Sequence, residues 1–187
     1  MKQQILLSKQ ARVLMKQACT FKTEIGYCGL VWVQDEVAGF FLPESRIDQL
    51  TQQLKKTSAS LVKNVEAPSW VQRLIKQLQK HLAGDKQDFT QVKIRKDGFS
   101  PFQWKVYATI QKIPPGKVYS YKEVGMAMGG SKAYRAIGTA LGKNPIPVLI
   151  PCHRVVGSNS KVGGFSAPGG IKTKLKLLKI EDSKFLI

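Results

Sequence analysis

The chain has 187 residues, 43% of them hydrophobic, which is enough for one large domain or two small ones with a real core. Thirty Lys and Arg against twelve Asp and Glu give a formal net charge of +18, which favours a polyanionic partner such as DNA, RNA or an acidic membrane over a merely solvated basic surface. The apolar run Ile5-Leu6-Leu7 in the basic N-terminal stretch is too short for a signal peptide or a membrane span, so we expect a cytoplasmic protein.

The chain has three cysteines, a small and odd number that does not fit a disulfide scaffold. Cys19, Cys28 and His81 could be combined into a metal site on paper, but they lack the close spacing of metal ligands. We therefore expect no metal and no cofactor.

The first half, residues 1–97, predicts a small mixed sheet with covering helices. A hairpin is expected over residues 21–42, with a polar turn at Gln34-Asp35-Glu36 and an end at Pro43. Phe89 to Ile94 alternates enough for one more strand. Helical spacing predicts a helix through Ile47, Leu50 and Leu54 and another that Ser69 caps and Gly84 ends, with its inward face made by Val71, Leu74, Ile75, Leu78 and Leu82.

The pattern changes near Asp97-Gly98, so residues 98–187 are expected to form a second, mainly helical domain. Ser100-Pro101 begins a helix that Pro114-Pro115-Gly116 terminates. The last helix is expected over roughly 172–181, with Leu175 and Leu178 toward the core. Its lysines are expected to face solvent or phosphate: Lys172, Lys174, Lys176 and Lys179.

Between these helices lie two shorter ones joined by Gly129-Gly130. Ser120 and Glu123 form a capping box for the first, which runs through Met128, and Ser131 can cap the second, which ends near Gly142. Two such helices are typical of a helix-turn-helix, which in a basic protein indicates nucleic-acid binding; an ordinary helical hairpin is the alternative.

A thiol lies directly beside an imidazole in Pro151-Cys152-His153-Arg154-Val155. A neighbouring histidine favours the reactive thiolate, so Cys152 is a candidate nucleophile, although a lone Cys-His pair also occurs by chance around inert buried cysteines. A short proline-containing connector joins it to the helix pair. The Gly- and Ser-rich segment 157–170 either arches over a pocket or is a mobile surface loop.

This segment, with Asn144-Pro145-Ile146-Pro147-Val148-Leu149-Ile150 before it, resembles the active-site signature of the O6-alkylguanine-DNA alkyltransferases. The resemblance extends from about Phe99 to Glu181 and includes Tyr119-Ser120-Tyr121 and Arg135-Ala136-Ile137-Gly138. The first half resembles that family only loosely, through Gly26-Tyr27-Cys28-Gly29-Leu30. What the resemblance implies is an α+β protein with a winged-helix-like helix-turn-helix. It would transfer the alkyl group from O6 of guanine, and possibly O4 of thymine, in double-stranded DNA to Cys152, once and irreversibly, as a monomer.

The resemblance also implies roles at the reacting thiol. His153 takes the thiol proton through a water, and Glu181 orients that histidine. Tyr121 protonates the leaving guanine, and Asn144 braces the turn before the active site. The residues alone favour a core tyrosine at a helix start for Tyr121, and a local Asn-Pro turn is the alternative for Asn144.

On the DNA side, the resemblance implies that Arg135 fills the gap left by a flipped nucleotide. Its alternative is a phosphate contact or a solvated charge. Small residues allow close approach to the minor groove, namely Ala133, Ala136 and Gly138. Tyr134 is bulky there and either stacks on a base or sugar or lies beside the groove.

In the substrate pocket, the backbone of Val155 is implied to meet the exocyclic amine of guanine, and Ser166 the O6 atom. Lys174 is implied to lie near the pocket, with a plain surface lysine as the alternative. Phe165 stands where a tyrosine is frequent, and Ala167-Pro168 lengthens the loop, so the pocket width is left open.

Two other functions fit parts of this pattern. A binding-only relative would recognise the lesion without repairing it, but it would lack the reactive cysteine. A Cys-His hydrolase would turn over, but the sequence has no acyl-transfer signature and such an enzyme has no need of a charge of +18.

Overall fold

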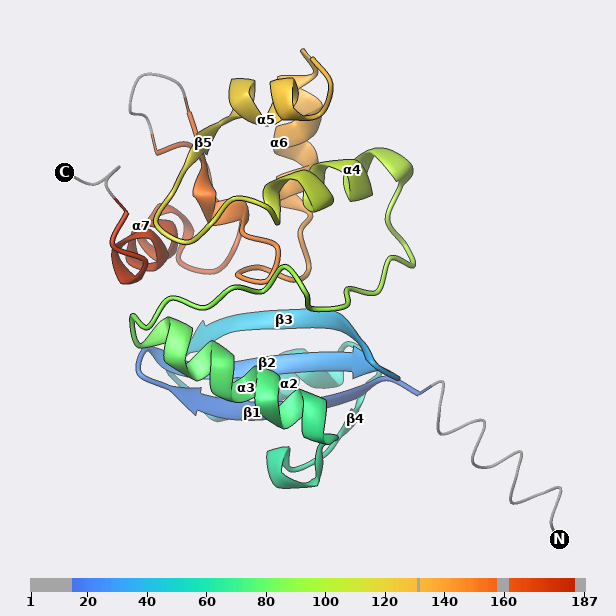
Figure 1. The fold of residues 1–187 in the computed structure, drawn as a ribbon. Helices are drawn as coiled ribbons and strands as arrows, with labels where there is room; N and C mark the ends of the chain where they lie inside the picture. The colour runs from blue at the N-terminus through green and yellow to red at the C-terminus, as the bar shows by residue number, and fades with distance from the viewer. Residues whose placement is uncertain (1–14, 131, 158–161, 184–187) are drawn as a thin grey trace, which may run out of the picture.

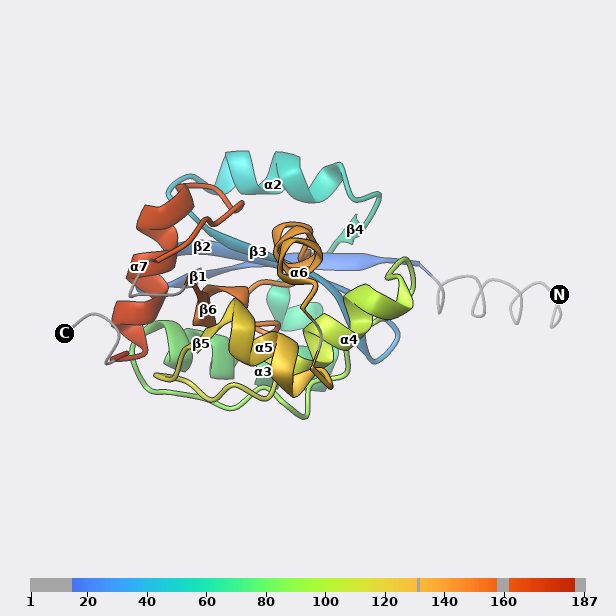
Figure 2. The same ribbon diagram turned by 90° about the horizontal axis from the view of Figure 1, so that it is seen from above.

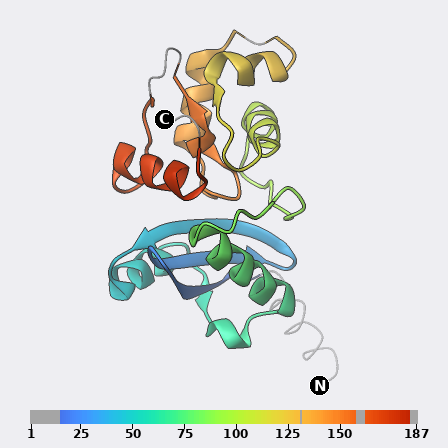
Figure 3. The same ribbon diagram turned by 60° about the vertical axis from the view of Figure 1, so that its left-hand side comes forward.

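The computed structural model describes residues 15–130, 132–157 and 162–183 (Figure 1). The expectations for the N-terminal stretch through residue 14, for the Ser131 cap and for residues 158–161 of the loop lie outside the described residues. The protein is a mixed α+β structure. Figure 3 shows a sheet with its helices on one side of a long crossing segment and a mainly helical part on the other. We call these parts the N-terminal half (residues 15–97) and the C-terminal half (residues 98–183).

The sheet has four strands in the order β3-β2-β1-β4. Neighbouring pairs β1–β2 and β2–β3 are antiparallel, and β4 joins β1 in parallel, so the sheet is mixed as predicted. The strands are β1 (Gln17–Thr23), β2 (Gly26–Val33), β3 (Glu36–Glu44) and β4 (Ser60–Leu61).

The single hairpin predicted over residues 21–42 is a three-strand meander. The polar turn forms, with Gln34 at a φ of 56°, but Phe21 belongs to a separate strand, β1. At the turn between β1 and β2, Gly26 has a φ of 134°, and a Cβ there would lie 2.8 Å from the Glu44 carbonyl oxygen. Pro43 does not end β3, because β3 is an edge strand and can lack one backbone donor.

The strand predicted for Phe89 to Ile94 does not form. Ile94 makes one isolated parallel bridge with Val37, flanked by hydrogen bonds from Val37 N to Lys93 O and from Arg95 N to Val37 O, both 2.8 Å. The Asp88 side chain accepts a hydrogen bond from Thr90 N at 2.8 Å, which holds the start of this segment in a turn. The segment instead crosses between the two halves along β3 (Figure 1).

Two helices cover opposite faces of the sheet, α2 (Ile47–Lys55) and α3 (Ser69–Leu82), as Figure 2 shows. Leu50 and Leu54 of α2 pack with Ala18 and Val31, whereas α3 lies on the face of Leu30 and its alternate neighbours. All five predicted inward residues of α3 are buried. The helix begins at Ser69 with Pro68 as its N-cap, so Ser69 does not cap it. A short 3-10 turn, η1 (Asn64–Glu66), precedes it.

In the C-terminal half, the predicted capping box of Ser120 with Glu123 forms, and the predicted N-cap Ser100 forms a second capping box with Gln103. The helices are α4 (Pro101–Ile110), α5 (Tyr121–Ala127), α6 (Tyr134–Gly142) and α7 (Gly170–Ile180), with the 3-10 turn η2 (Cys152–Arg154). A two-residue parallel ladder joins β5 (Tyr119–Ser120) to β6 (Val155–Val156) and so places the start of α5 beside the cysteine segment.

One cluster of buried side chains runs through both halves, from the α3 side of the sheet to the residues around Cys152. The two halves therefore share a core. Within the described ranges, no helix is both long and apolar enough to cross a membrane.

Candidate active site

Cys152 begins η2 at the end of a tight turn that the Asn144 side chain holds. Asn144 Nδ2 donates to Ile150 O at 2.7 Å and to Cys152 Sγ at 3.2 Å, and Oδ1 accepts from Ile146 N at 3.0 Å. Within this turn Val148 has a φ of 71°, which a β-branched side chain rarely adopts. The expected bracing role of Asn144 thus has a direct geometric basis, and the same side chain also reaches the sulfur.

His153 and Glu181 form a buried pair behind the cysteine. His153 Nε2 lies 2.9 Å from Glu181 Oε1, and both side chains are essentially without solvent contact. Because Nε2 meets a carboxylate, we assign the imidazole proton to Nε2, which leaves Nδ1 as the basic nitrogen. Nδ1 is buried and has no hydrogen-bond partner among the described residues.

Glu181 also receives donors that the sequence did not indicate. Arg154 donates from Nη2 to Oε1 at 2.7 Å and from Nε to Oε2 at 3.0 Å, and Gly116 N donates to Oε2 at 3.3 Å. His81 Nε2, from the last turn of α3, lies 3.1 Å from Oε1. Arg154 was part of the recognised signature without a role, and nothing in the sequence links His81 or Gly116 to residue 181.

The surroundings set the protonation states of these groups. Burial raises the pKa of the Cys152 thiol, against the hydrogen bond from Asn144 and the charge of Lys174, which lower it. Burial lowers the pKa of His153, although Glu181 acts in the opposite sense, so the imidazole rests in its neutral form. Burial would raise the pKa of Glu181, but the hydrogen bonds from His153, His81 and Arg154 hold it well below its usual range. A neutral base beside a protonated thiol is an arrangement suited to general-base activation.

A cavity of about 350 Å³ opens at Cys152 under the helix pair. Tyr121, the first residue of α5, lines it together with Phe165 and Ser166 of the loop. Burial, with a smaller contribution from Cys152, raises the pKa of the Tyr121 hydroxyl. Ser166 Oγ donates to Gly142 O at 2.8 Å. Gly138 belongs to this wall rather than to the open face of α6, since a Cβ there would lie 3.6 Å from the Tyr121 ring.

A second cavity of about 350 Å³ also reaches Cys152 and shares Phe165 and Ser166 with the first. It extends to β3 in the N-terminal half, and Ala167-Pro168 forms part of its wall. Its remaining apolar lining comes mainly from Phe40, Phe41, Leu42, Leu141, Pro145 and Pro147.

Lys174 does not lie on the surface, in contrast to the expectation for the lysines of the last helix. It is 1% exposed, and its Nζ donates to Val155 O at 2.6 Å and to Gly164 O at 3.5 Å. Burial lowers its pKa to about 8. The lysine thus ties α7 to the cysteine segment and to the pocket loop. The carbonyl of Val155, which was expected to meet substrate, already accepts this hydrogen bond.

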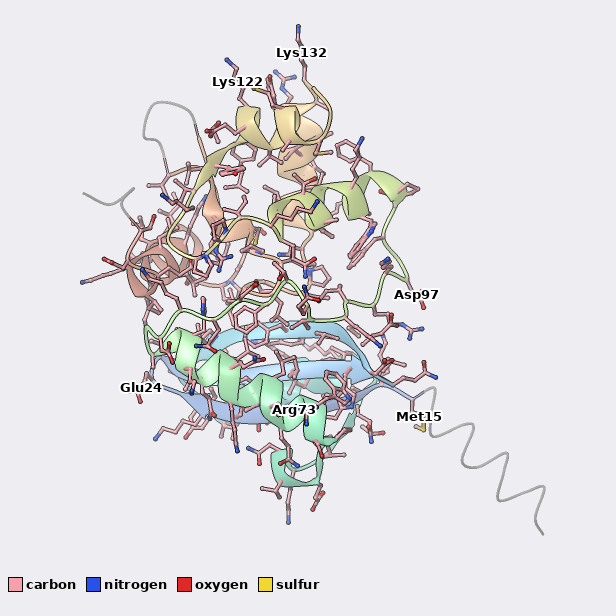
Figure 4. All side chains as sticks on the ribbon, in the orientation of Figure 1. Met15, Glu24, Arg73, Asp97, Lys122 and Lys132 are labelled. Atoms are coloured by element: carbon pink, nitrogen blue, oxygen red, sulfur yellow. The ribbon has the colours of Figure 1, made fainter. Side chains whose placement is uncertain are left out.

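The residues expected at DNA lie together on the exposed start of α6: Ala133, Tyr134, Arg135 and Ala136. Lys122 and Lys132 project from the same outer end of the α5–α6 pair, away from the sheet (Figure 4). Residues 98–187 carry fourteen of the thirty Lys and Arg but only three of the twelve Asp and Glu. The positive excess is therefore greatest in the half that presents this surface.

Within the described residues, no group of three or more His, Cys, Asp or Glu side chains is placed to hold a metal ion. His81 lies against Glu181 and Phe89. Cys19 and Cys28 are buried in the sheet, where burial raises the pKa of each thiol to about 12.

Comparisons with known proteins point to one family. The family model for the 6-O-methylguanine DNA methyltransferase DNA-binding domain matches residues 101–183. A constitutive methylated-DNA–protein-cysteine methyltransferase of Bacillus subtilis is 32% identical over 89% of this chain and 96% of its own length. A relative of the same name from Metallosphaera sedula is 44% identical over 59% of this chain and 67% of its own length.

The fold agrees as well. A crystal structure of Mycobacterium tuberculosis OGT in complex with DNA superposes with a TM-score of 0.70 and 27% identity, covering 91% of this chain and 97% of that one. An O6-methylguanine-DNA methyltransferase from Pyrococcus kodakaraensis gives a TM-score of 0.63 over 88% of this chain and 99% of its own. The similarity to the Bacillus subtilis relative covers nearly the full length of that protein and of this chain, and not only the cysteine signature. This chain therefore belongs to the methylated-DNA–protein-cysteine methyltransferase family.

Proposed function

We propose that this protein repairs DNA by moving the alkyl group from O6 of an alkylated guanine to Cys152, once per molecule. The observation that carries the proposal is the arrangement at the thiol. Cys152 opens onto a cavity under a basic helix pair, while the adjacent His153 is held by Glu181 with its second ring nitrogen unpaired.

The reaction begins with loss of the thiol proton. Because burial keeps Cys152 protonated, a base must take that proton, and Nδ1 of His153 does so through a water. Glu181 stabilises the imidazolium that forms, as the third member of a triad does. Asn144 Nδ2 and the Lys174 charge stabilise the thiolate.

The thiolate then attacks the alkyl carbon. An S–C bond forms as the C–O6 bond breaks, and the electron pair of the broken bond stays on the guanine. Tyr121 gives its hydroxyl proton to a ring nitrogen of that anion, so that a neutral base leaves. The S–C bond is not hydrolysed, which makes the transfer stoichiometric.

Access to a stacked base requires that the nucleotide leave the duplex, which costs roughly a few kcal/mol. We propose that α5 and α6 act as a helix-turn-helix in the minor groove and that Arg135 occupies the gap. Ala133 and Ala136 permit close approach, and Tyr134, 39% exposed, lies against the adjacent sugar or base. Residues 98–187 then form the DNA-binding and transfer domain, with the β5–β6 ladder as its wing, and residues 1–97 form a supporting domain that shares a core with it.

In the pocket, the carbonyl of Val155 can accept a second hydrogen bond from the guanine amine, because an oxygen has two lone pairs. The Ser166 hydroxyl must leave Gly142 to donate to O6. The second cavity provides room beside Cys152 for the alkyl group, so we propose that groups bulkier than methyl are accepted.

The experiment is intact-mass analysis after incubation with double-stranded DNA that contains O6-methylguanine. The expected result is one added methyl on Cys152, with DNA repaired in amounts capped at one per protein. Cys152→Ala should give no adduct yet keep its affinity for the lesion. Binding without an adduct in the native protein would instead identify a lesion-binding relative, and turnover of an ester or amide by unmodified protein would identify a hydrolase.

A further inference from the structure

His81 is a buried histidine outside the cysteine segment that touches the active-site carboxylate. It comes from the N-terminal half, a hundred residues before Glu181 in the chain, and is 1% exposed. Figure 1 shows the end of α3 beside α7, where the two halves meet.

Three contacts fix the His81 ring. Its Nε2 lies 3.1 Å from Glu181 Oε1, and its Nδ1 accepts a hydrogen bond from Gln87 N at 3.2 Å. The His81 and Phe89 rings pack in a T-shaped arrangement with their centroids 5.1 Å apart. A backbone N–H can only donate, so Nδ1 must be bare and the proton must lie on Nε2. His81 is therefore a fixed donor to Glu181.

His81 and His153 share one carboxylate oxygen. Oε1 of Glu181 receives Nε2 of both rings, at 3.1 and 2.9 Å, together with Nη2 of Arg154. The other charged groups at this end of α7, Lys86 and Asp182, form an ion pair 3.6 Å long at the surface. The position of Glu181 and the charge that it directs at His153 thus depend on a donor supplied by the other half.

We propose that His81 is a positioning residue for alkyl transfer: its Nε2–H fixes Glu181 so that His153 keeps its own proton on Nε2 and offers Nδ1 as the base. This inference rests on the proposed function and assigns a catalytic task to the N-terminal half. His81 itself touches neither the thiol nor the substrate cavity.

The test compares single-turnover rate constants for methyl transfer across pH, normalised to the amount of reactive protein. His81→Phe keeps a ring against Phe89 but removes the donor. The Glu181 carboxylate then acts more strongly on His153 and raises its pKa. The midpoint of the increase in rate constant with pH should therefore shift to a pH higher by about 0.5–1 unit. On the acid side of this increase, where the fraction of neutral His153 limits the reaction, the rate constant should fall about three- to tenfold, and it should approach the native value at higher pH.

His81→Gln retains an N–H donor and should restore the native pH profile to within about twofold. Phe89→Leu is the matched control, because it loosens the same packing without touching the carboxylate, and its normalised profile should stay native. A native profile in His81→Phe, or an equal shift in Phe89→Leu, would overturn the proposal.

A measurement on the unaltered protein covers the case in which His81→Phe does not fold. Nitrogen-15 spectra of its two histidines should show both rings protonated at Nε2 and bare at Nδ1. A His81 proton on Nδ1 overturns the positioning role. Absence of any methyl adduct in the native protein would instead remove the proposed function itself, so the two failures are distinguishable.

Discussion

Asn144 combines two tasks in one side chain, because it closes the turn before Cys152 and donates to the sulfur that we propose as the nucleophile. Asn144→Asp keeps the acceptor for Ile146 N but loses both donors and adds negative charge beside Cys152. The pKa of Cys152, already raised by burial, should rise further. Less thiolate is then formed at pH 7, so methyl transfer should slow by about tenfold or more.

This change is measured as the single-turnover rate constant from pH 6 to pH 10. The loss should shrink as pH rises and more of the thiol ionises. A constant deficit at every pH would show that Asn144 acts only through the backbone turn.

Lys174 makes a separate prediction about stability. Its pKa is lowered by burial to about 8 in the folded protein, against about 10.4 in an unfolded chain. Between these values the unfolded state binds more protons, so the lysine contribution to stability increases with pH in that window. The free energy of unfolding of the native protein relative to Lys174→Met should therefore rise by roughly 1–3 kcal/mol from pH 7 to pH 10.

Chemical denaturation at each pH measures this difference. In the unfolded chain the thiols of Cys19 and Cys28 ionise in the same pH region, which lowers stability as pH rises, but both proteins carry these thiols and the effect cancels. A difference that does not change with pH would mean that the pKa of Lys174 is not lowered in the folded state.

At this scale the sequence was informative about Cys152, His153 and Asn144, which lie within eleven residues of one another. Helix periodicity predicted an exposed face for Lys174, whereas the family resemblance implied a place near the pocket. Lysine spacing along a helix does not reveal that the carbonyl of Val155 accepts a hydrogen bond from this side chain. His81 could not be assigned, since its partner is set by how α3 docks against α7.

Among the elements, α6 carries the most direct prediction. Arg135 is exposed in its first turn, and the proposed task is to occupy the gap left by the flipped nucleotide. Arg135→Ala should slow repair of duplex DNA by about tenfold or more, because the extruded state loses a stabilising group, while reaction with free O6-methylguanine base should stay native.

Lys132→Ala is the control, since Lys132 is exposed at the same end of the helix pair and offers charge alone. It should weaken binding modestly and in a salt-dependent way on any DNA. Equal losses for Arg135→Ala on duplex and free base would remove its role in extrusion.

Local signals predicted most helices well. The Ser100 N-cap and the Ser120 capping box lie where expected, because each depends only on side chains within about three residues of the helix start. The segment Phe89 to Ile94 shows the limit of such patterns. Its alternation matches a strand, but one bridge to Val37 is all that forms, because the chain must leave the sheet there to reach α4.

For the whole molecule, alkylation of Cys152 should lower the melting temperature. The thiol is 8% exposed and touches Asn144, so an added group displaces a hydrogen bond in a close-packed region. A methyl should cost about 1–3 kcal/mol, which is a few degrees for a chain of this size. Differential scanning fluorimetry before and after reaction measures it, with unreactive Cys152→Ala treated in parallel; an unchanged melting temperature would contradict the expectation.

The way the halves join is the part that composition and periodicity could not supply. The sequence pattern predicted a domain boundary near Asp97-Gly98 and indicated no catalytic residue before it. In the structure, β3 lines a cavity that reaches the thiol and α3 supplies a donor to Glu181. Both contacts depend on the relative placement of two segments that no local pattern encodes.

The burial of Cys19 and Cys28 in the sheet confines alkylation of the protein to one cysteine. Cys19 and Cys28 are held inside the sheet with pKa values of about 12, whereas Cys152 opens onto a cavity and has His153 beside it, so Cys152 is the thiol that is placed to accept an alkyl group. Each molecule is then either unalkylated and active or alkylated and inactive. The alkylated fraction, measured in a single mass spectrum, gives the number of lesions that the protein has repaired. The unalkylated fraction gives the number that it can still repair.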